Sequence, residues 1–252
     1  MLLITACTTL PCGSDSCPIG SSDESYNAAA PSDTAIHDYI LAHGDVILQA
    51  LQENQKRQQA ARLAVAGKAI AENKAALFDD ARDGVAGNPK GDVTVVEFFD
   101  NECPYCKKVA PDLDKLIAAD KGVRVVYKEF PILGPMSVIA AKAALASQGQ
   151  GKFVAFHRAL MADKTAEHQL TETHLLEIAG AVGLDIARLR RDMAAPEIQA
   201  QLDATIALAR KIGITGTPGL IVGDSLTPGA LPYEALVQAV AAARGQRTAA
   251  GQ

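Results

Sequence analysis

The sequence predicts an α/β fold that carries a large inserted helical subdomain and an N-terminal helical extension. An apolar run, Val93–Phe99, leads into a Cys-x-x-Cys pair at Cys103 and Cys106, and a helical pattern begins at that pair. Residues 135–211 show helical patterns almost throughout, which is far more than one crossover between parallel strands requires. With 252 residues, 48% of them hydrophobic, the chain can bury one substantial core and a smaller appended segment.

Residues 1–32 predict the remnant of an export signal followed by a flexible tether. Ile-Thr-Ala-Cys at residues 4–7 resembles the cleavage box of a bacterial lipoprotein signal, although the apolar part before it is short and lacks basic residues. An accidental match is the alternative to export with lipidation at Cys7. Residues 14–32 are rich in Ser, Asp, Ala and Pro, and this composition cannot bury enough apolar surface to offset the entropy of ordering.

Residues 33–76 predict two helices outside the main core. Asp33 can cap the first, which carries apolar residues at the spacing i, i+3, i+4, and Gly44 ends it. The second begins at Asp45 and is polar nearly all round over residues 52–59. A helix with so thin an apolar stripe is completed by partner helices or folds back on its own domain. Self-association into a homo-oligomer is the favoured interpretation.

The main domain, residues 77–252, is expected to begin with a short strand at Leu77 and Phe78 and a turn-rich loop over residues 84–91. Residues 93–99 then form a buried strand by their β-branched and aromatic content. The helical pattern after the cysteines ends at Gly122, and residues 123–127 indicate another strand. Strand, helix and strand together predict a βαβ unit with a parallel pair.

The inserted subdomain, about residues 135–211, is expected to consist of amphipathic helices separated by glycine and proline. A short buried strand, a brief edge strand and a closing helix should follow it. The predicted helices of the insertion cover residues 140–146, 153–161, 172–182, 186–193 and 198–209, the buried strand covers residues 220–222, and the closing helix covers residues 233–243.

Charge and hydropathy argue against two kinds of partner. The net charge is −5 and no block of five like charges occurs, so neither a nucleic acid nor an anionic membrane surface is an expected partner. No apolar run approaches the roughly 20 residues that a membrane-spanning helix needs.

Cys103 and Cys106 lie at positions i and i+3 in the first turn of a helix, which places both sulfurs on one face and close enough to form a disulfide. The first sulfur lies over unpaired amide N–H groups and the positive end of the helix dipole, which favour a thiolate. Pro104 suits the N1 position, where it costs no hydrogen bond. Cys103 is therefore predicted to be the reactive thiolate and Cys106 the resolving thiol.

Half of a zinc site is the competing interpretation of the two cysteines. Zinc needs two further ligands, and no second cysteine pair or His-x-x-x-His follows in the folded part of the sequence. The βαβ context favours a redox dithiol, and no metal site is expected.

Glu-Phe-Phe at residues 97–99, Cys-Pro-Tyr-Cys at residues 103–106 and Thr217-Pro218 before a strand resemble the thioredoxin superfamily. Over about residues 77–244, the helical insertion makes the chain similar to the DsbA-like bacterial envelope oxidoreductases. Residues 33–76 resemble the N-terminal segment of ScsC-type proteins, suppressors of copper sensitivity, in which such a segment supports oligomers.

The resemblance implies a cis peptide bond between Thr217 and Pro218, with the Thr217 backbone beside the dithiol, where it can pair with an extended substrate strand. A trans proline at the start of an edge strand is the alternative. The resemblance also implies that Glu97 is a buried acid that shuttles protons to the resolving cysteine, and burial would raise its pKa. A solvent-facing edge glutamate is the alternative.

Tyr105 sets an expectation about the redox poise of the dithiol. It carries no positive charge, unlike the histidine of the strongly oxidising DsbA proteins that the chain resembles. The thiolate is therefore stabilised less by side-chain charge, and the site is expected to be less oxidising.

The expected function is thiol-disulfide exchange in the periplasm or cell envelope, in which the Cys103–Cys106 dithiol forms, reduces or isomerises protein disulfides without another cofactor. The expected partners are protein substrates with cysteines and a membrane redox protein that recycles the dithiol. The alternative function is a copper-protection module whose thiols sequester Cu(I), with Cys12 and Cys17 as further candidate ligands. A tail with incidental or disulfide-linked cysteines is the other interpretation of those two residues.

Overall fold

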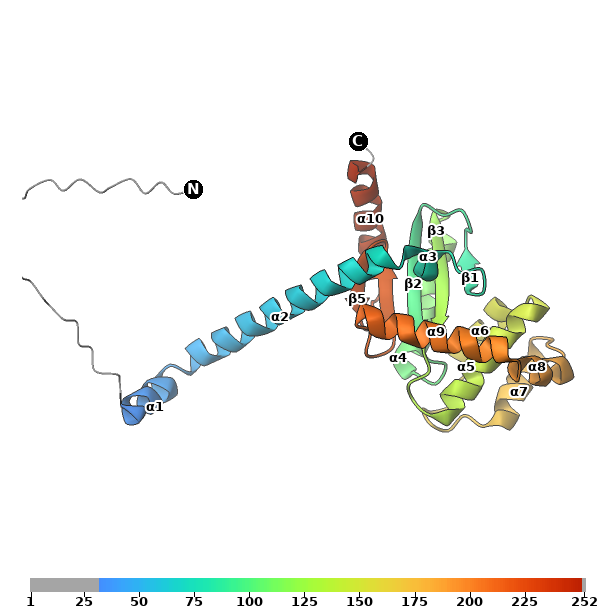
Figure 1. Cartoon of the computed structure of the whole chain (residues 1–252), viewed down its shortest axis with the longest axis horizontal. Coiled ribbons are helices and arrows are strands. Elements are labelled where there is room, and N and C mark those ends of the chain that lie inside the picture. The colour runs from blue at the N-terminus through green and yellow to red at the C-terminus, as the bar shows by residue number, and fades with distance from the viewer. Residues whose placement is uncertain (1–31, 251–252) are drawn as a thin grey trace, which may run out of the picture. The chain divides into compact units, whose positions relative to one another are not determined.

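A mixed sheet forms the centre of the computed structural model, which describes residues 32–250. The five strands found among these residues are arranged in the order β1-β3-β2-β4-β5 (Figure 1). β2 and β3 are parallel, and every other neighbouring pair is antiparallel. The strands are β1 (Gly84–Gly87), β2 (Val93–Phe99), β3 (Val123–Glu129), β4 (Gly219–Val222) and β5 (Ser225–Pro228).

The β2–α4–β3 unit positions the dithiol. β2 and β3 pair in parallel along their whole length, which confirms the predicted βαβ unit. Helix α4 (Pro104–Ala119) joins them and buries Cys106, Val109, Leu113 and Leu116, whose spacing places them on one face of the helix. Each fully buried leucine or valine side chain stabilises this packing by about 1.5–3 kcal/mol. The first turn of α4 is thereby held at the end of a central strand.

Helices on both sides of the sheet complete the larger unit. All five helices predicted for the insertion are confirmed, and the first of them begins earlier than expected, at Pro135. The insertion contains α5 (Pro135–Ser147), the short 3-10 helix η1 (Gln148–Gln150), α6 (Phe153–Ala162), α7 (Glu172–Ala181), α8 (Ile186–Met193) and α9 (Pro196–Ile212), and α10 (Tyr233–Ala250) follows β5.

Helix α2 (Gly44–Glu72) crosses the boundary between the two units of the described chain, which lies after residue 52. Within the larger unit, the end of α2 and the whole of α3 (Lys74–Phe78) lead into the main core. Three side chains near the end of α2 are buried there: Ala66, Ala69 and Ile70. The last turns of α2 therefore belong to the fold of the main domain.

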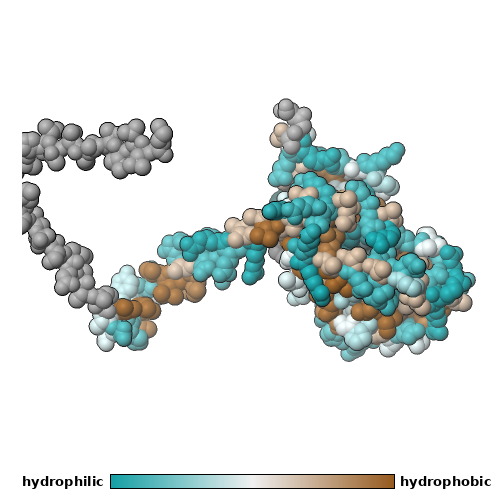
Figure 2. All heavy atoms as spheres, in the orientation of Figure 1, coloured by the Kyte–Doolittle hydropathy of each residue, from teal (hydrophilic) through white to brown (hydrophobic). Residues whose placement is uncertain are grey.

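The smaller unit presents apolar side chains to solvent. Helix α1 (Asp33–Ala42) begins after Ser32, whose Oγ accepts a hydrogen bond from the N–H of Ala35, so the cap is Ser32 and not Asp33. No residue of α1 is buried, and Leu41 is 70% exposed. Figure 2 shows this apolar surface in brown along α1 and the first turns of α2.

Two expectations about the entry to the main domain are wrong. Leu77 and Phe78 end helix α3 instead of forming a strand, and residues 84–87 form strand β1 instead of a loop. Glycine at position 84 leaves room for the ring of Phe153, because a Cβ added there would lie 1.9 Å from a ring atom. The local glycine content indicates a turn, but pairing with β3 and packing against α6 make this segment a strand.

The two faces of β2 carry different cores. Val95 and Phe99 pack into the core that contains both cysteines of the dithiol. Val96 and Phe98 pack into the core formed with the end of α2, α3 and α9. Because successive side chains of a strand point to opposite faces, Glu97 shares the face of Val95 and Phe99 and lies on the dithiol side of the sheet.

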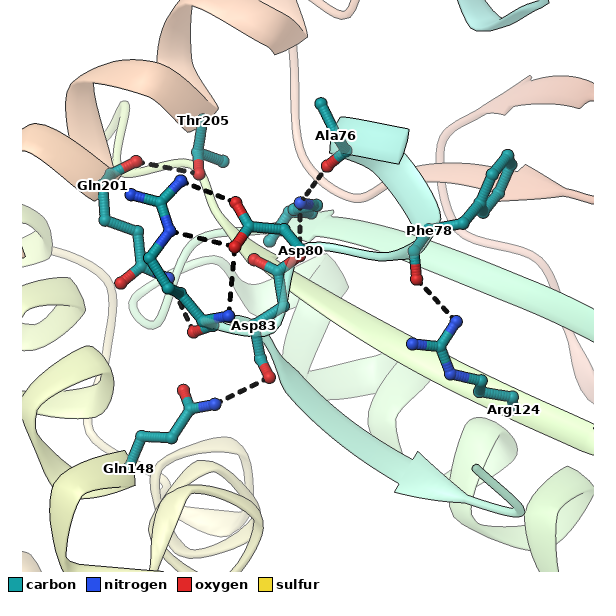
Figure 3. A network of polar contacts seen from close by, with 10 residues as sticks. Ala76, Phe78, Asp80, Asp83, Arg124, Gln148, Gln201 and Thr205 are labelled. Atoms are coloured by element: carbon teal, nitrogen blue, oxygen red, sulfur yellow. Dashed lines mark hydrogen bonds and ion pairs between the residues drawn. The ribbon is translucent and has the colours of Figure 1, made fainter. Parts of the chain in front are cut away.

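A buried polar network holds the segment that enters the domain after α3 (Figure 3). Lys128 of β3 forms a buried ion pair with Asp83, and its Nζ donates a hydrogen bond to the carbonyl of Ala76 at 2.5 Å. Gln148 of η1 donates to the carbonyl of Asp83 at 2.8 Å. Gln201 of α9 donates to the carbonyl of Arg82 at 2.7 Å. Side chains from the sheet and from the insertion therefore converge on one short connecting segment.

Candidate active site

The dithiol lies where β2 ends and α4 begins. Cys103 is the N-cap residue of α4, with φ −69° and ψ 119°, and Pro104 is the first residue of the helix, as predicted. The N–H of Cys103 donates to the carbonyl of Asp100 at 3.1 Å, and its own carbonyl accepts from the N–H of Lys107 at 3.0 Å. Both cysteines are buried free thiols, whereas Pro104 and Tyr105 are exposed, Tyr105 by 63%.

Hydrogen bonds lower the pKa of the Cys103 thiol to about 6. The bond from the Cys106 thiol has the largest effect and burial opposes it, while bonds from the side chain of Thr217 and from the backbone N–H groups of Tyr105 and Cys106 lower the pKa further. Such donors stabilise the thiolate and not the neutral thiol. At neutral pH Cys103 is therefore mostly an ionised nucleophile.

The Cys106 thiol has the opposite character. Burial raises its pKa well above the ordinary value for cysteine, and its hydrogen bond to Cys103 and the charge of Glu97 raise it further. Cys106 therefore keeps its proton until a nearby base removes it. Because the pKa of Cys103 is low and that of Cys106 is high, the two sulfurs react differently. Cys103 can attack first, and Cys106 can attack only after losing its proton.

Glu97 is the titratable group of β2 that lies behind the dithiol. Its side chain is 1% exposed, and neither carboxyl oxygen has a hydrogen-bond partner. Burial, and secondarily the charge of Cys103, raise its pKa to about 8. The predicted burial is confirmed, and the alternative of a solvent-facing edge glutamate is excluded. Its function in proton transfer stays a prediction.

The loop before β4 faces the reactive sulfur. The peptide bond between Thr217 and Pro218 is cis, as the resemblance implies. The carbonyl oxygen of Thr217 lies 3.4 Å from Cys103 Sγ, across 114 positions of sequence. The fold therefore brings together the two motifs that the sequence places far apart.

Asp100 is a residue of the site that sequence reasoning missed. It is fully buried, and its carboxylate accepts hydrogen bonds from the N–H groups of Glu102 at 2.8 Å, Ile132 at 2.8 Å and Leu133 at 3.0 Å. These bonds connect the dithiol loop to the segment that enters α5. The sequence signal for this anchoring position is an Asp that directly follows an apolar strand.

A further buried acid, Glu129, lies at the end of β3. Its Oε2 accepts a hydrogen bond from Asn101 at 2.8 Å, and burial raises its pKa well above the usual range for glutamate. Nearby, Ser137 of α5 donates to the buried Glu102 at 3.1 Å. No role is predicted for Glu129 from the sequence, because it lies beyond the expected strand, residues 123–127.

The candidate metal ligands do not form a cluster in the described chain. Within residues 32–250, no three His, Cys, Asp or Glu side chains are arranged to hold a metal ion. Cys7, Cys12 and Cys17 lie outside the described residues. Lipidation at Cys7 and copper binding at Cys12 and Cys17 therefore stay predictions.

Replacing Glu97 with glutamine is expected to remove a rise in the rate of mixed-disulfide resolution near pH 8, the pH at which Glu97 ionises. Glutamine cannot take the Cys106 proton, so at pH 8 and above we expect resolution to slow by roughly a hundredfold or more. Stopped-flow measurement across the pH range provides the test. An unchanged profile would show that Glu97 has a structural role only.

The same substitution has an expected effect on stability with a defined sign. The pKa of Glu97 is about 8 in the folded chain, against an ordinary value of 4.5, so the unfolded state loses its proton at lower pH. The free energy of unfolding of the wild type should therefore fall as the pH rises from 4.5 to about 8. In the Glu97→Gln variant the contribution of Glu97 to that fall should be missing, so urea denaturation curves measured on both sides of the interval should show a smaller fall than in the wild type.

The fold and the site together define the class of protein. A thiolate at the start of a helix, with a buried acid behind it and a cis-proline loop in front, is the arrangement of thioredoxin-fold thiol-disulfide oxidoreductases. The helical insertion between β3 and β4 places the chain in the DsbA-like group. In agreement, residues 94–241 match the family model of the DSBA-like thioredoxin domain, and the chain belongs to this family.

Three solved structures show the likeness. A thioredoxin-like oxidoreductase from Silicibacter pomeroyi is 49% identical, with a TM-score of 0.66, and the match covers 69% of this chain and 98% of that one. A variant of Proteus mirabilis ScsC is 27% identical over 87% of this chain and 99% of that one, with a TM-score of 0.69. A periplasmic thioredoxin-like protein from Salmonella enterica is 31% identical over 68% of this chain and 95% of that one, with a TM-score of 0.60.

Curated relatives include proteins of a different size. A Na(+)/H(+) antiporter NhaA from Salinispora tropica is 33% identical over 167 residues, which are 66% of this chain, and the chain spans about a quarter of the length of such antiporters. Among the helices of residues 32–250, none is long and apolar enough to span a membrane. A probable disulfide bond formation protein D from Bacillus anthracis is 30% identical over 56% of this chain and 69% of its own length.

Proposed function

We propose that the chain catalyses thiol-disulfide exchange on proteins of the bacterial cell envelope, using Cys103 and Cys106 and no further cofactor. The observation that carries the proposal is the low pKa of the Cys103 thiol together with the Thr217 carbonyl 3.4 Å from its sulfur. A thiolate beside a main-chain carbonyl can attack a disulfide that is presented by an extended polypeptide.

In the reducing direction, the Cys103 thiolate attacks one sulfur of a substrate disulfide, and the other substrate sulfur leaves as a thiolate that takes a proton from water. Cys106 then gives its proton to the Glu97 carboxylate and attacks Cys103 Sγ. The bond between Cys103 and the substrate breaks, and the second substrate sulfur is released and protonated. Two electrons pass from the dithiol to the substrate, and the chain retains a Cys103–Cys106 disulfide. The reverse sequence oxidises a substrate dithiol.

Reduction and isomerisation are the directions that the site favours over strong oxidation. Tyr105, between the two cysteines, is exposed and carries no charge, so it adds no electrostatic stabilisation to the thiolate. Isomerisation returns the dithiol to its starting state, whereas net reduction or oxidation requires a membrane redox partner to recycle it.

A homo-oligomer formed through residues 33–76 is part of this proposal. Its support is the apolar surface of α1 and the start of α2, and a likeness to Proteus mirabilis ScsC that extends beyond the main domain to 87% of the chain. Several tethered dithiols can attack one misfolded substrate repeatedly, because tethering raises their effective concentration. This arrangement favours disulfide isomerisation.

Removing residues 1–52 is expected to convert the oligomer to a folded monomer. The exposed apolar residues of α1 and early α2 lie in this segment, whereas Ala66, Ala69 and Ile70 belong to the main core and must be kept. In light scattering, the full-length chain should have a multiple of its 26.3 kDa mass and the shortened chain its own single mass. A full-length monomer would contradict the oligomer and favour simple oxidation.

The proposed location is the periplasm, and Cys7 is the candidate site of lipid attachment. The likeness to a periplasmic protein of Salmonella enterica supports export. The copper alternative would use the thiols of Cys103 and Cys106 to sequester Cu(I), with Cys12 and Cys17 as further candidate ligands, and no observation on the described residues favours it.

Insulin reduction and refolding of scrambled ribonuclease test the proposed function directly. The full-length chain should accelerate insulin precipitation in the presence of a thiol reductant and should recover native ribonuclease from the scrambled form. A chain that is inert in both assays, with its thiols reduced at the start, would contradict the proposal.

A further inference from the structure

A surface groove of the larger unit leads from the cis-proline loop to helix α2. It consists of two adjoining cavities, one of about 210 Å³ beside Thr217 and Pro218 and one of about 710 Å³ beside α2. Gly213, Thr215 and Leu226 line both cavities, so the two form one continuous surface. The groove therefore begins next to the place where a substrate chain meets Cys103.

The larger cavity offers apolar surface. Leu63 and Val65 of α2 line it and remain open to solvent, Val65 by 67%, and the partly buried Leu226 of β5 lines it as well. A volume of about 710 Å³ is within the range of sites that enclose small ligands, so it has room for several amino-acid side chains.

The charged residues that line the larger cavity are all basic: Arg62, Arg210 and Lys211. Within residues 32–250, neither arginine has an ion-pair partner, and the Lys211 ammonium donates to the neutral amide oxygen of Asn73 at 3.1 Å. In a chain with a net charge of −5, these side chains create a local positive potential. The groove is therefore complementary to carboxylates.

We propose that this groove binds an extended segment of the protein substrate beside its reacting cysteine, and that it prefers segments with acidic and apolar side chains. This inference rests on the proposed thiol-disulfide exchange, because that reaction places the substrate chain at Thr217. β5 is an edge strand of the sheet, so its outer main-chain groups are available to pair with an added strand. Helix α2 thereby becomes a wall of the substrate site.

Two other occupants have compatible chemistry. Residues 1–31 of the same chain carry three acidic side chains, Asp15, Asp23 and Glu24, and a second copy could contribute the apolar surface of α1. Continuity with the cis-proline cavity favours the substrate, because the groove extends the surface that the reacting polypeptide must cross. The experiment separates the three occupants.

The test compares the full-length wild type with the double variant Arg62→Glu and Arg210→Glu. The matched control is Arg57→Glu with Lys90→Glu, which changes the net charge equally at two exposed positions outside the groove. Each protein is assayed with three disulfides: glutathione disulfide, and two peptides with one glutathionylated cysteine, flanked on both sides by Asp and Leu or by Lys and Ser.

The wild type and the control should prefer the acidic, apolar peptide in kcat/KM, and the groove variant should lose about tenfold for that peptide only. The preference should weaken at high salt. Reaction with glutathione disulfide should stay unchanged in all three proteins, and its absence in the wild type would mean that the proposed function, not the groove, had failed.

Three results would overturn the assignment of the groove. The groove variant could keep the full preference for the acidic peptide, or the control could lose it equally. The groove variant could instead have a smaller mass in light scattering than the wild type, which would identify a second copy as the occupant. Removal of residues 1–31 could raise kcat/KM for both peptides in the wild type but not in the groove variant, which would identify the chain's own N-terminal segment.

Discussion

Replacing Cys103 with serine is expected to abolish insulin reduction and ribonuclease isomerisation. A serine hydroxyl stays protonated at neutral pH and cannot form a disulfide, so neither the first attack nor the mixed disulfide can occur. In the wild type the pKa of this thiol is about 6, so the nucleophile is already mostly ionised at pH 7. We therefore expect kcat/KM to fall by roughly a thousandfold or more.

The matched control for this prediction is Cys106→Ser, which keeps the nucleophile and removes the resolving thiol. This variant should still attack a substrate disulfide but should stop at the mixed disulfide, which intact-mass spectrometry would detect. In the wild type, the rate of Cys103 alkylation should rise with pH through about 6, the pH at which the thiol ionises. Activity that survives in Cys103→Ser would contradict the whole assignment of the site.

Replacing Lys128 with methionine is expected to lower the free energy of unfolding by about 3–5 kcal/mol at pH 8. Lys128 and Asp83 are a buried ion pair, and Lys128 also donates to the carbonyl of Ala76. The substitution therefore leaves a buried carboxylate without its partner and a carbonyl without its donor. Urea denaturation followed by circular dichroism measures the effect.

The loss of stability in Lys128→Met should depend on pH with a defined sign. Burial raises the pKa of Asp83 to about 6 in the wild type, so this carboxyl is charged at pH 8 and mostly neutral at pH 5. A neutral Asp83 needs no cation, so the loss should be smaller at pH 5. The double variant with Asp83→Asn should be more stable at pH 8 than Lys128→Met alone.

Lys121→Met provides the control for this series, because Lys121 is exposed. Its free energy of unfolding should change by no more than about 0.5 kcal/mol. If Lys128→Met were as stable as the wild type at pH 8, the polar network of Figure 3 would not contribute to the fold.

Several elements of the fold follow from local sequence patterns. The β-branched run of β2, the helix that starts at Pro104 and the amphipathic helices of the insertion each carry a periodic pattern or a start or stop signal within a few residues. Strand β1 does not, because its glycines indicate a turn and only the ring of Phe153 and the edge of β3 make it a strand. Likewise, nothing local shows that Ile70 of the long polar helix is buried in the main core.

The features of the active site likewise fall into those set by local sequence and those set by tertiary contacts. The sequence by itself determined that Cys103 and Cys106 form a dithiol at a helix start, because their spacing and Pro104 act within one turn. Only the tertiary structure decided the unpartnered burial of Glu97, the anchoring of the dithiol loop by Asp100 and the groove beside α2. The burial of these side chains and the way they come together depend on contacts between segments that lie far apart in the sequence. Cys103 and Thr217, for example, are 114 positions apart, and local periodicity carries no information about such contacts.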